Sequence, residues 1–236
     1  MSSPEADIAE NVVPETAPKP SWFARLMRWL DNAGQNYRIT RFVLLRFTGL
    51  VYFVAFLTSA QQFLPLLGHD GLLPADLFVE RVLHGRSPWT LFWQAPSVFW
   101  FDCSDTMIQA VTWTGVVLSA VVMCGFANSL IMLVLWALYL SLHPIGQEWM
   151  GYGWDIQILE TGFLGVMLCP LLDPRPFPKR APPVVIVWLY RWLIFRIMVG
   201  AGLIKLRGDP CWRDFTALYY HYETQPVPNP LSRLLH

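Results

Sequence analysis

The stretch that decides the fold is VVIVWLYRWLIFRIMVGAGLIKL, residues 184–206. It is long enough to cross a bilayer, because about 20 helical residues span the roughly 30 Å of hydrocarbon. Three cations stand within it: Arg191, Arg196 and Lys205. An ion near the bilayer centre costs at least about 2.5–3.5 kcal/mol, so such residues are candidates for function. The stretch indicates a membrane protein that keeps polar groups inside the membrane.

Composition favours the membrane class and argues against two others. Hydrophobic residues make up 54% of the chain and charged residues 14%, against about 25% charged in typical soluble domains. The formal net charge is zero, which leaves no basic surface of the kind that binds nucleic acid. The four cysteines form no CxxC and no zinc-like Cys/His spacing. We therefore expect no nucleic-acid partner and no metal.

Five apolar segments predict an all-α, polytopic membrane bundle of about five transmembrane helices. They are residues 42–67, 107–126, 127–142, 156–172 and 184–206. The third and fourth are short, so a re-entrant third element is an alternative to a full crossing. We divide the chain into a disordered tail (1–20), an interfacial amphipathic helix (21–40), the bundle (41–206) and a far-side segment (207–236).

The distribution of Lys and Arg predicts the orientation. Cations cluster before the first apolar segment and again at Arg175, Lys179 and Arg180, whereas residues 144–155 have none. The positive-inside rule places both clusters in the cytosol, together with the N-terminus. Five crossings then bring 68–106, 144–155 and 207–236 together in the lumen or periplasm.

Arg196 needs a counter-ion inside the membrane. It lies about 18 Å along its helix from Val184, at 1.5 Å per residue, which places it near the midplane. Glu160 is the only acid well inside any apolar segment, so we predict an intramembrane ion pair. The pair either fixes the register of the bundle or serves in catalysis or a relay.

Small residues offer a second pair of interpretations. Gly200 and Gly202 in the last segment, and Gly162 and Gly165 in the fourth, allow helices to approach closely. The same residues could instead open a groove for a lipid or a quinone. We expect packing and no cofactor, with a quinone or another lipid-soluble cofactor as the alternative.

The segment beyond residue 206 is rich in aromatic side chains. Gly208-Asp209-Pro210 breaks the helix, and a second short helix follows. An aromatic belt at the membrane surface is one interpretation, and a platform that binds client proteins is the other. The candidate residues are Trp212, Tyr219, Tyr220, His221, Tyr222 and Glu223. Cys103 and Cys211 fall on the same, oxidising side and could form a disulfide.

Several long motifs resemble the lipase maturation factor family. They are GHDGLLP (68–74), SPWTLFWQAPSVFWF (87–101), SLHPIGQEWMGYGWDIQILETGFLG (141–165), YRWLIFRIMVGAGLIKLRGD (190–209) and CWRDFTALYYHYETQPVPNP (211–230). The resemblance implies a multi-pass membrane protein, in animals of the endoplasmic reticulum, that is needed for maturation of secreted homodimeric lipases. The expected partners are membrane lipids and secreted clients. Family members continue beyond the position of His236 with further spans and a large lumenal domain, so a fragment, a short isoform and a minimal bacterial member, which would lie in the inner membrane, all fit.

A shorter resemblance supplies the rival hypothesis. Residues 201–206, with Trp212 beyond them, are similar to a stretch of the vitamin K-dependent gamma-carboxylases, which implies that Lys205 is a catalytic base. A lysine at an apolar helix end can have its pKa lowered enough for that role, yet it can equally snorkel to the headgroups. The sequence contains no other catalytic constellation. We expect a folding factor that is not an enzyme, with a purely scaffolding protein as a third possibility.

Overall fold

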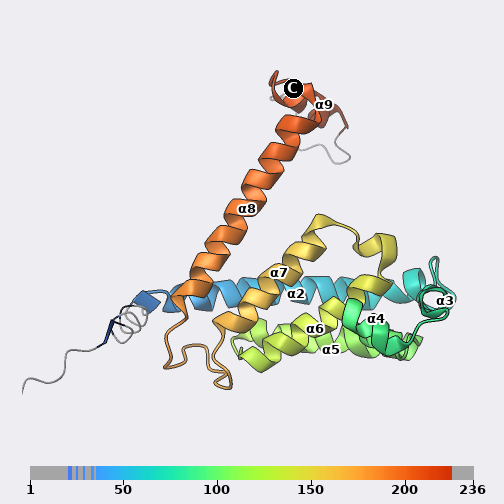
Figure 1. Cartoon of the computed structure of the whole chain (residues 1–236), viewed down its shortest axis with the longest axis horizontal. Coiled ribbons are helices and arrows are strands. Elements are labelled where there is room, and N and C mark those ends of the chain that lie inside the picture. Colours follow the sequence, from blue (N-terminus) through green and yellow to red (C-terminus); the bar gives the residue numbers. More distant parts are fainter. Residues whose placement is uncertain (1–20, 23–24, 26–28, 30–32, 35, 225–236) are drawn as a thin grey trace, which may run out of the picture.

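The computed structural model describes residues 21–22, 25, 29, 33–34 and 36–224 (Figure 1). Every regular element in that part of the chain is helical, which confirms the predicted all-α class. The tail predicted for residues 1–20 lies outside the described residues, as do residues 23–24, 26–28, 30–32 and 35 of the predicted interfacial helix. So do residues 225–236.

Five long helices occupy the five predicted apolar segments. They are α2 (Arg38–Leu67), α5 (Asp105–Cys124), α6 (Ser129–Ile145), α7 (Gly153–Leu168) and α8 (Val184–Gly208). Three of them, α2, α5 and α8, are long and apolar enough to cross a membrane. This is an integral membrane protein. With 17 and 16 residues, α6 and α7 reach only about 24–26 Å at 1.5 Å per residue, so five full crossings stay a prediction.

Local turn chemistry divides the long apolar run between α5 and α6. Gly125 ends α5 with φ +123°, a conformation that favours glycine. Three residues later the side chain of Asn128 accepts a hydrogen bond from the N–H of Ile131 and caps α6. The resulting tight turn sends α6 back along α5, close to the boundary predicted from the sequence.

The core lies where α2 packs against α5 and α7. Tyr52 and Phe56 on α2 are completely buried, and the Tyr52 hydroxyl donates a hydrogen bond to the carbonyl of Ile158 on α7. Two glycines permit this packing. A Cβ on Gly49 would lie 2.8 Å from the main-chain nitrogen of Met123, and one on Gly162 would overlap the Tyr52 hydroxyl. The predicted packing role holds for Gly162.

Short helices cover one end of the bundle (Figure 1). They are α3 (Ala75–Leu83), α4 (Pro88–Gln94), η1 (Val98–Trp100) and η2 (Gln147–Met150). The buried Ser97 hydroxyl donates to the carbonyl of Ser141 on α6 and ties this cap to the bundle. Residues 68–106 and 144–155, predicted as loops between the apolar segments, both contain helical turns.

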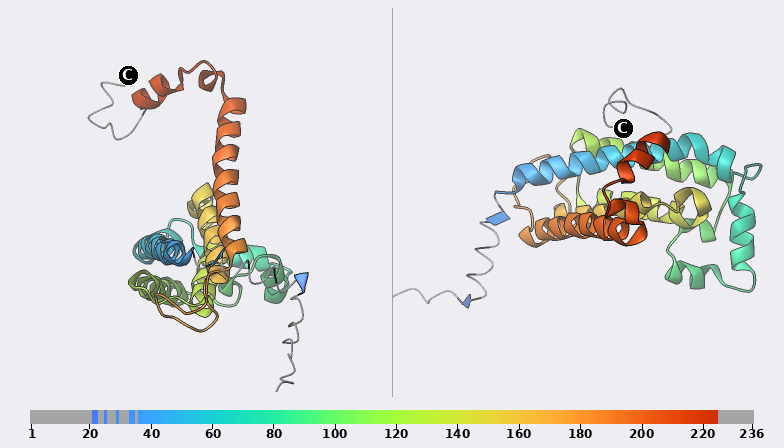
Figure 2. Two further views of the ribbon diagram at one scale, coloured as in Figure 1. Left: turned by 90° about the vertical axis from the view of Figure 1, so that its left-hand side faces the viewer. Right: turned by 90° about the horizontal axis from the view of Figure 1, so that it is seen from above.

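The last long helix leaves the bundle. Figures 1 and 2 show α8 rising away from the other helices and carrying η3 (Pro210–Trp212) and α9 (Ala217–Thr224) at its outer end. Its buried residues all lie between Val184 and Leu193. A Cβ on Gly200 or Gly202 would meet nothing within 4 Å. The packing expected at these two glycines is therefore absent from the described part of the chain.

Candidate functional site

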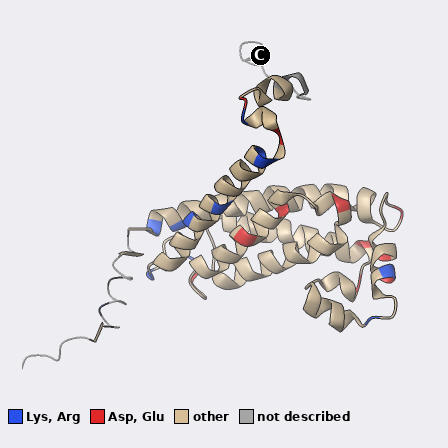
Figure 3. Ribbon diagram, turned by 45° about the horizontal axis from the view of Figure 1, so that its top comes forward, with Lys and Arg blue, Asp and Glu red and all other residues tan. Residues whose placement is uncertain are grey.

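Arg196 and Glu160 form an ion pair between α8 and α7, through Nη2 and Oε2. Few charges accompany them, and most of the ribbon in Figure 3 is tan. One and a half turns earlier on α8, the Tyr190 hydroxyl donates to the carbonyl of Thr161 at 2.9 Å. The two side chains of the ion pair keep 52% and 35% of their surfaces exposed. The pair thus lies on the exposed side of the α7–α8 contact, just beyond Leu193, the last buried residue of α8.

Lys205 lies in the last turn of α8 and contacts Trp212. Its Nζ stands 4.6 Å from the centre of the indole ring, a distance typical of a cation–π contact. Arg213, directly after η3, donates from Nε to the carbonyl of Leu206 on α8 at 2.8 Å and also holds η3 against the end of α8. This arrangement favours an anchoring role for Lys205, because the contact fixes η3 against the end of α8.

The aromatic segment presents a broad surface at the outer end of α8. Tyr219 and Tyr220 on α9 are 54% and 62% exposed, and His221 is exposed beside them. Tyr222 and Glu223 belong to the same helix, but their side chains lie outside the described ones. Phe215, which the sequence analysis did not single out, is 90% exposed and has φ +59°. A bulky residue in that conformation marks a turn that the surrounding fold imposes.

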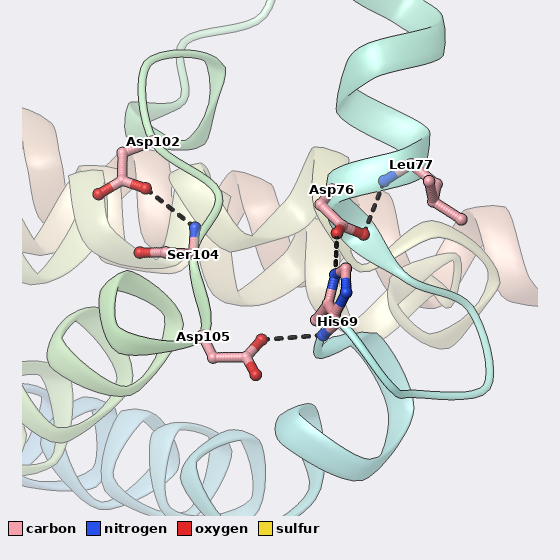
Figure 4. A network of polar contacts seen from close by, with 6 residues as sticks. All are labelled: His69, Asp76, Leu77, Asp102, Ser104 and Asp105. Atoms are coloured by element: carbon pink, nitrogen blue, oxygen red, sulfur yellow. Dashed lines mark hydrogen bonds and ion pairs between the residues drawn. The ribbon is translucent and has the colours of Figure 1, made fainter.

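A polar network lies beside the helical cap, which is formed by the short helices α3, α4, η1 and η2 (Figure 4). The main-chain N–H of His69 donates to Asp105 at 2.9 Å, and the His69 ring hydrogen-bonds Asp76 through Nδ1 at 2.6 Å. One residue thereby links the end of α2 to the beginnings of α3 and α5. The network borders a cavity of about 850 Å³, which is also lined by Glu80, His84 and Cys103.

Electrostatics and burial set the chemistry of this cavity. The hydrogen bond between His69 and Asp76 raises the pKa of the imidazole and lowers the pKa of the carboxyl. Burial raises the pKa of Cys103 to about 12, so the thiol stays protonated near neutral pH and is a poor nucleophile. The cavity therefore presents carboxylates and the His69 imidazole, whose hydrogen bond to Asp76 favours its protonated form, and its thiol is not activated.

The two cysteines of the predicted disulfide are free. Cys103 lies half-buried at the cavity, and Cys211 lies in η3 at the end of α8. Burial and the Asp209 carboxylate both raise the pKa of Cys211. The Cys103–Cys211 bond stays a prediction. Among the described residues no group of three or more His, Cys, Asp or Glu side chains could hold a metal ion.

Comparison with known proteins places these features in a family. Residues 39–236 match the family described as "Lipase maturation factor transmembrane domain". This chain belongs to the lipase maturation factor family. The match includes the ion pair, the His69 network and the aromatic segment.

Curated members of the lipase maturation factor family support the assignment. Lipase maturation factor 1 of Bos taurus is 48% identical over 209 residues, which cover 85% of this chain and 37% of the relative. The Mus musculus protein of the same name is 42% identical across 100% of this chain and 43% of its own length. Human lipase maturation factor 2 is 34% identical, over 84% of this chain and 30% of its own length. The chain thus spans about two fifths of the factor 1 relatives. No solved structure matches it.

The GHDGLLP segment, residues 68–74, has a clear position in this structure. It forms the turn after α2 and contributes His69 to the network in Figure 4. Asp76 and Asp105 were not predicted as partners of His69, because they stand 7 and 36 residues further along the chain. The only signal in the sequence was the number of acidic residues near 68–74 and 102–105. Their spacing does not indicate which of them contacts His69.

Proposed function

We propose that this chain is a membrane maturation factor for secreted lipases, with its far-side surfaces in the lumen of the endoplasmic reticulum. Membership of the lipase maturation factor family carries the proposal. The Lys and Arg distribution supports a cytosolic N-terminus, which puts η3 and α9 on the lumenal side. The clients are immature lipase chains that have been translocated into the lumen.

The client-binding surface in this proposal is the aromatic segment from Trp212 to α9. Tyrosine provides a large rigid contact area with a polar tip, and such residues are enriched where proteins bind one another. The exposed rings of Tyr219, Tyr220 and Phe215 supply that area. Because α8 carries the segment away from the bundle (Figure 2), a client can approach it without displacing the helical cap.

The double substitution Tyr219→Ala, Tyr220→Ala tests this surface. We expect client binding to fall about tenfold or more, since tyrosine is enriched among interface hot spots, whose truncation costs about 2 kcal/mol or more. The measurement is crosslinking to a newly made lipase in microsomes, together with secreted lipase activity per unit of membrane protein. Trp93→Ala is the matched control, because Trp93 is 81% exposed on α4 and lies outside the proposed surface. Equal binding by the double variant and the unchanged protein would reject the tyrosines as the client surface.

Lys205→Arg separates a maturation factor from a carboxylase-like enzyme in the same assay. Arginine keeps a cation that can lie over Trp212, but it cannot release its proton near neutral pH. We expect this variant to support lipase secretion at the level of the unchanged protein. Abolished secretion at normal abundance would instead make Lys205 a base.

A further inference from the structure

Arg41 is a buried cation whose guanidinium is only partly satisfied by the protein. It lies in the first turn of α2 and is 3% exposed. Its Nη1 donates to the main-chain carbonyl of Arg180 at 3.0 Å. A guanidinium has five N–H donors, and among the described residues no carboxylate forms an ion pair with this one. The nearby Asp173 is held by Arg175 at 2.9 Å.

A buried charge without a counter-ion is costly, so the surroundings of Arg41 indicate which anion neutralises it. Arg41 lines a cavity of about 270 Å³ where α2, α6 and the loop between α7 and α8 meet. Arg180 and Ser129 also line this cavity, and no acidic residue does. Two arginines around a space large enough for a small anion form a site for a phosphate group, because guanidinium groups bind phosphate oxygens bidentately. The Ser129 hydroxyl donates to the Cys169 carbonyl at 3.0 Å, so the arginines supply the donors.

The rest of the lining is apolar. Leu168, Pro170 and Pro183 complete the walls, and Met167 and Leu171 stand at the cavity with 43% and 69% of their surfaces exposed. A free phosphate would gain nothing from these side chains, whereas an acyl chain would cover them. Arg41 lies about 4.5 Å from the start of α2, at 1.5 Å per residue, which places it at the depth of the headgroups.

We propose that this cavity binds the phosphate of an anionic membrane phospholipid between Arg41 and Arg180. The lipid would neutralise Arg41 and join α2, α6 and the α7–α8 loop at the membrane surface. The site lies at the opposite end of the bundle from the helical cap and is independent of client binding.

Short-chain phosphatidic acid is the probe, titrated into the purified chain in neutral detergent and followed by the shift in melting temperature. We expect binding at least tenfold tighter than that of short-chain phosphatidylcholine. Arg41→Gln, which keeps an amide donor for the Arg180 carbonyl, should weaken phosphatidic acid binding about 10- to 100-fold, as expected for loss of charged hydrogen bonds. Arg180→Gln should also weaken phosphatidic acid binding, and it leaves in place the main-chain carbonyl that accepts from Arg41.

Lys179→Gln is the matched control, since it removes one charge from the same loop at a residue that does not line the cavity. The affinity of this variant for phosphatidic acid should stay within twofold of that of the unchanged protein. Equal binding by Arg41→Gln and the unchanged protein would overturn the site, as would an equal loss in Lys179→Gln, which would indicate nonspecific attraction. Inorganic phosphate that bound as tightly as phosphatidic acid would overturn the lipid assignment.

Discussion

Replacement of Glu160 by leucine, or of Arg196 by leucine, is expected to destabilise the membrane domain by about 3–5 kcal/mol. Each change leaves the other charge of the α7–α8 ion pair without its partner. In water an exposed pair would be worth little, but both residues stand within apolar segments that the sequence places in the membrane, and an uncompensated ion in hydrocarbon is expensive. The melting temperature in nanodiscs and the steady-state level in cells should both fall.

The double variant Glu160→Leu, Arg196→Leu should recover most of that loss, because neither charge remains. Arg191→Leu is the control on the same helix. The Arg191 guanidinium contacts the Tyr37 hydroxyl and the Trp188 ring and pairs with no carboxylate among the described residues, so the effect should be small. Losses that add in the double variant would show that Glu160 and Arg196 do not compensate each other. Normal folding of the double variant together with absent lipase secretion would assign the pair a functional role.

The helices could be predicted because their signals are local. Apolar length locates α2, α5 and α8, and the turn residues Gly125 and Asn128 separate α5 from α6. The partnership of Arg196 with Glu160 was also predictable. An arginine in hydrocarbon needs a counter-ion, and Glu160 is the only acid within the five apolar segments.

The remaining features depend on tertiary contacts. The divergence of α8 depends on where its buried face ends, at Leu193, and hydropathy does not change at that residue. The His69 network joins residues 7 and 36 positions apart. Arg41 resembles any other interfacial arginine in sequence, and only the packing of the loop around Arg180 makes it a buried cation.

Gly49→Val is expected to destabilise the α2–α5 interface by about 3 kcal/mol, at the upper end of the usual cost of overpacking. A Cβ at this position would stand 2.8 Å from the main-chain nitrogen of Met123 and 2.9 Å from the Val122 side chain. The main chain of α5 cannot rotate out of the way as a side-chain tip can, so the two helices must move apart. Gly49→Ala should have a smaller effect in the same direction, since alanine's helix propensity offsets up to about 1 kcal/mol. Thermal unfolding in nanodiscs measures both.

Gly200→Ala on α8 is the matched comparison, because a Cβ there meets nothing within 4 Å in the described structure. The added methyl should leave stability unchanged or raise it by up to about 1 kcal/mol through helix propensity. The contrast between Gly49→Ala and Gly200→Ala tests which helix faces are packed, since each adds one methyl to a glycine in an apolar helix. Gly49→Val with the stability of the unchanged protein would refute the close approach of α2 and α5. A loss at Gly200→Ala as large as that at Gly49→Ala would show that another surface covers the outer half of α8.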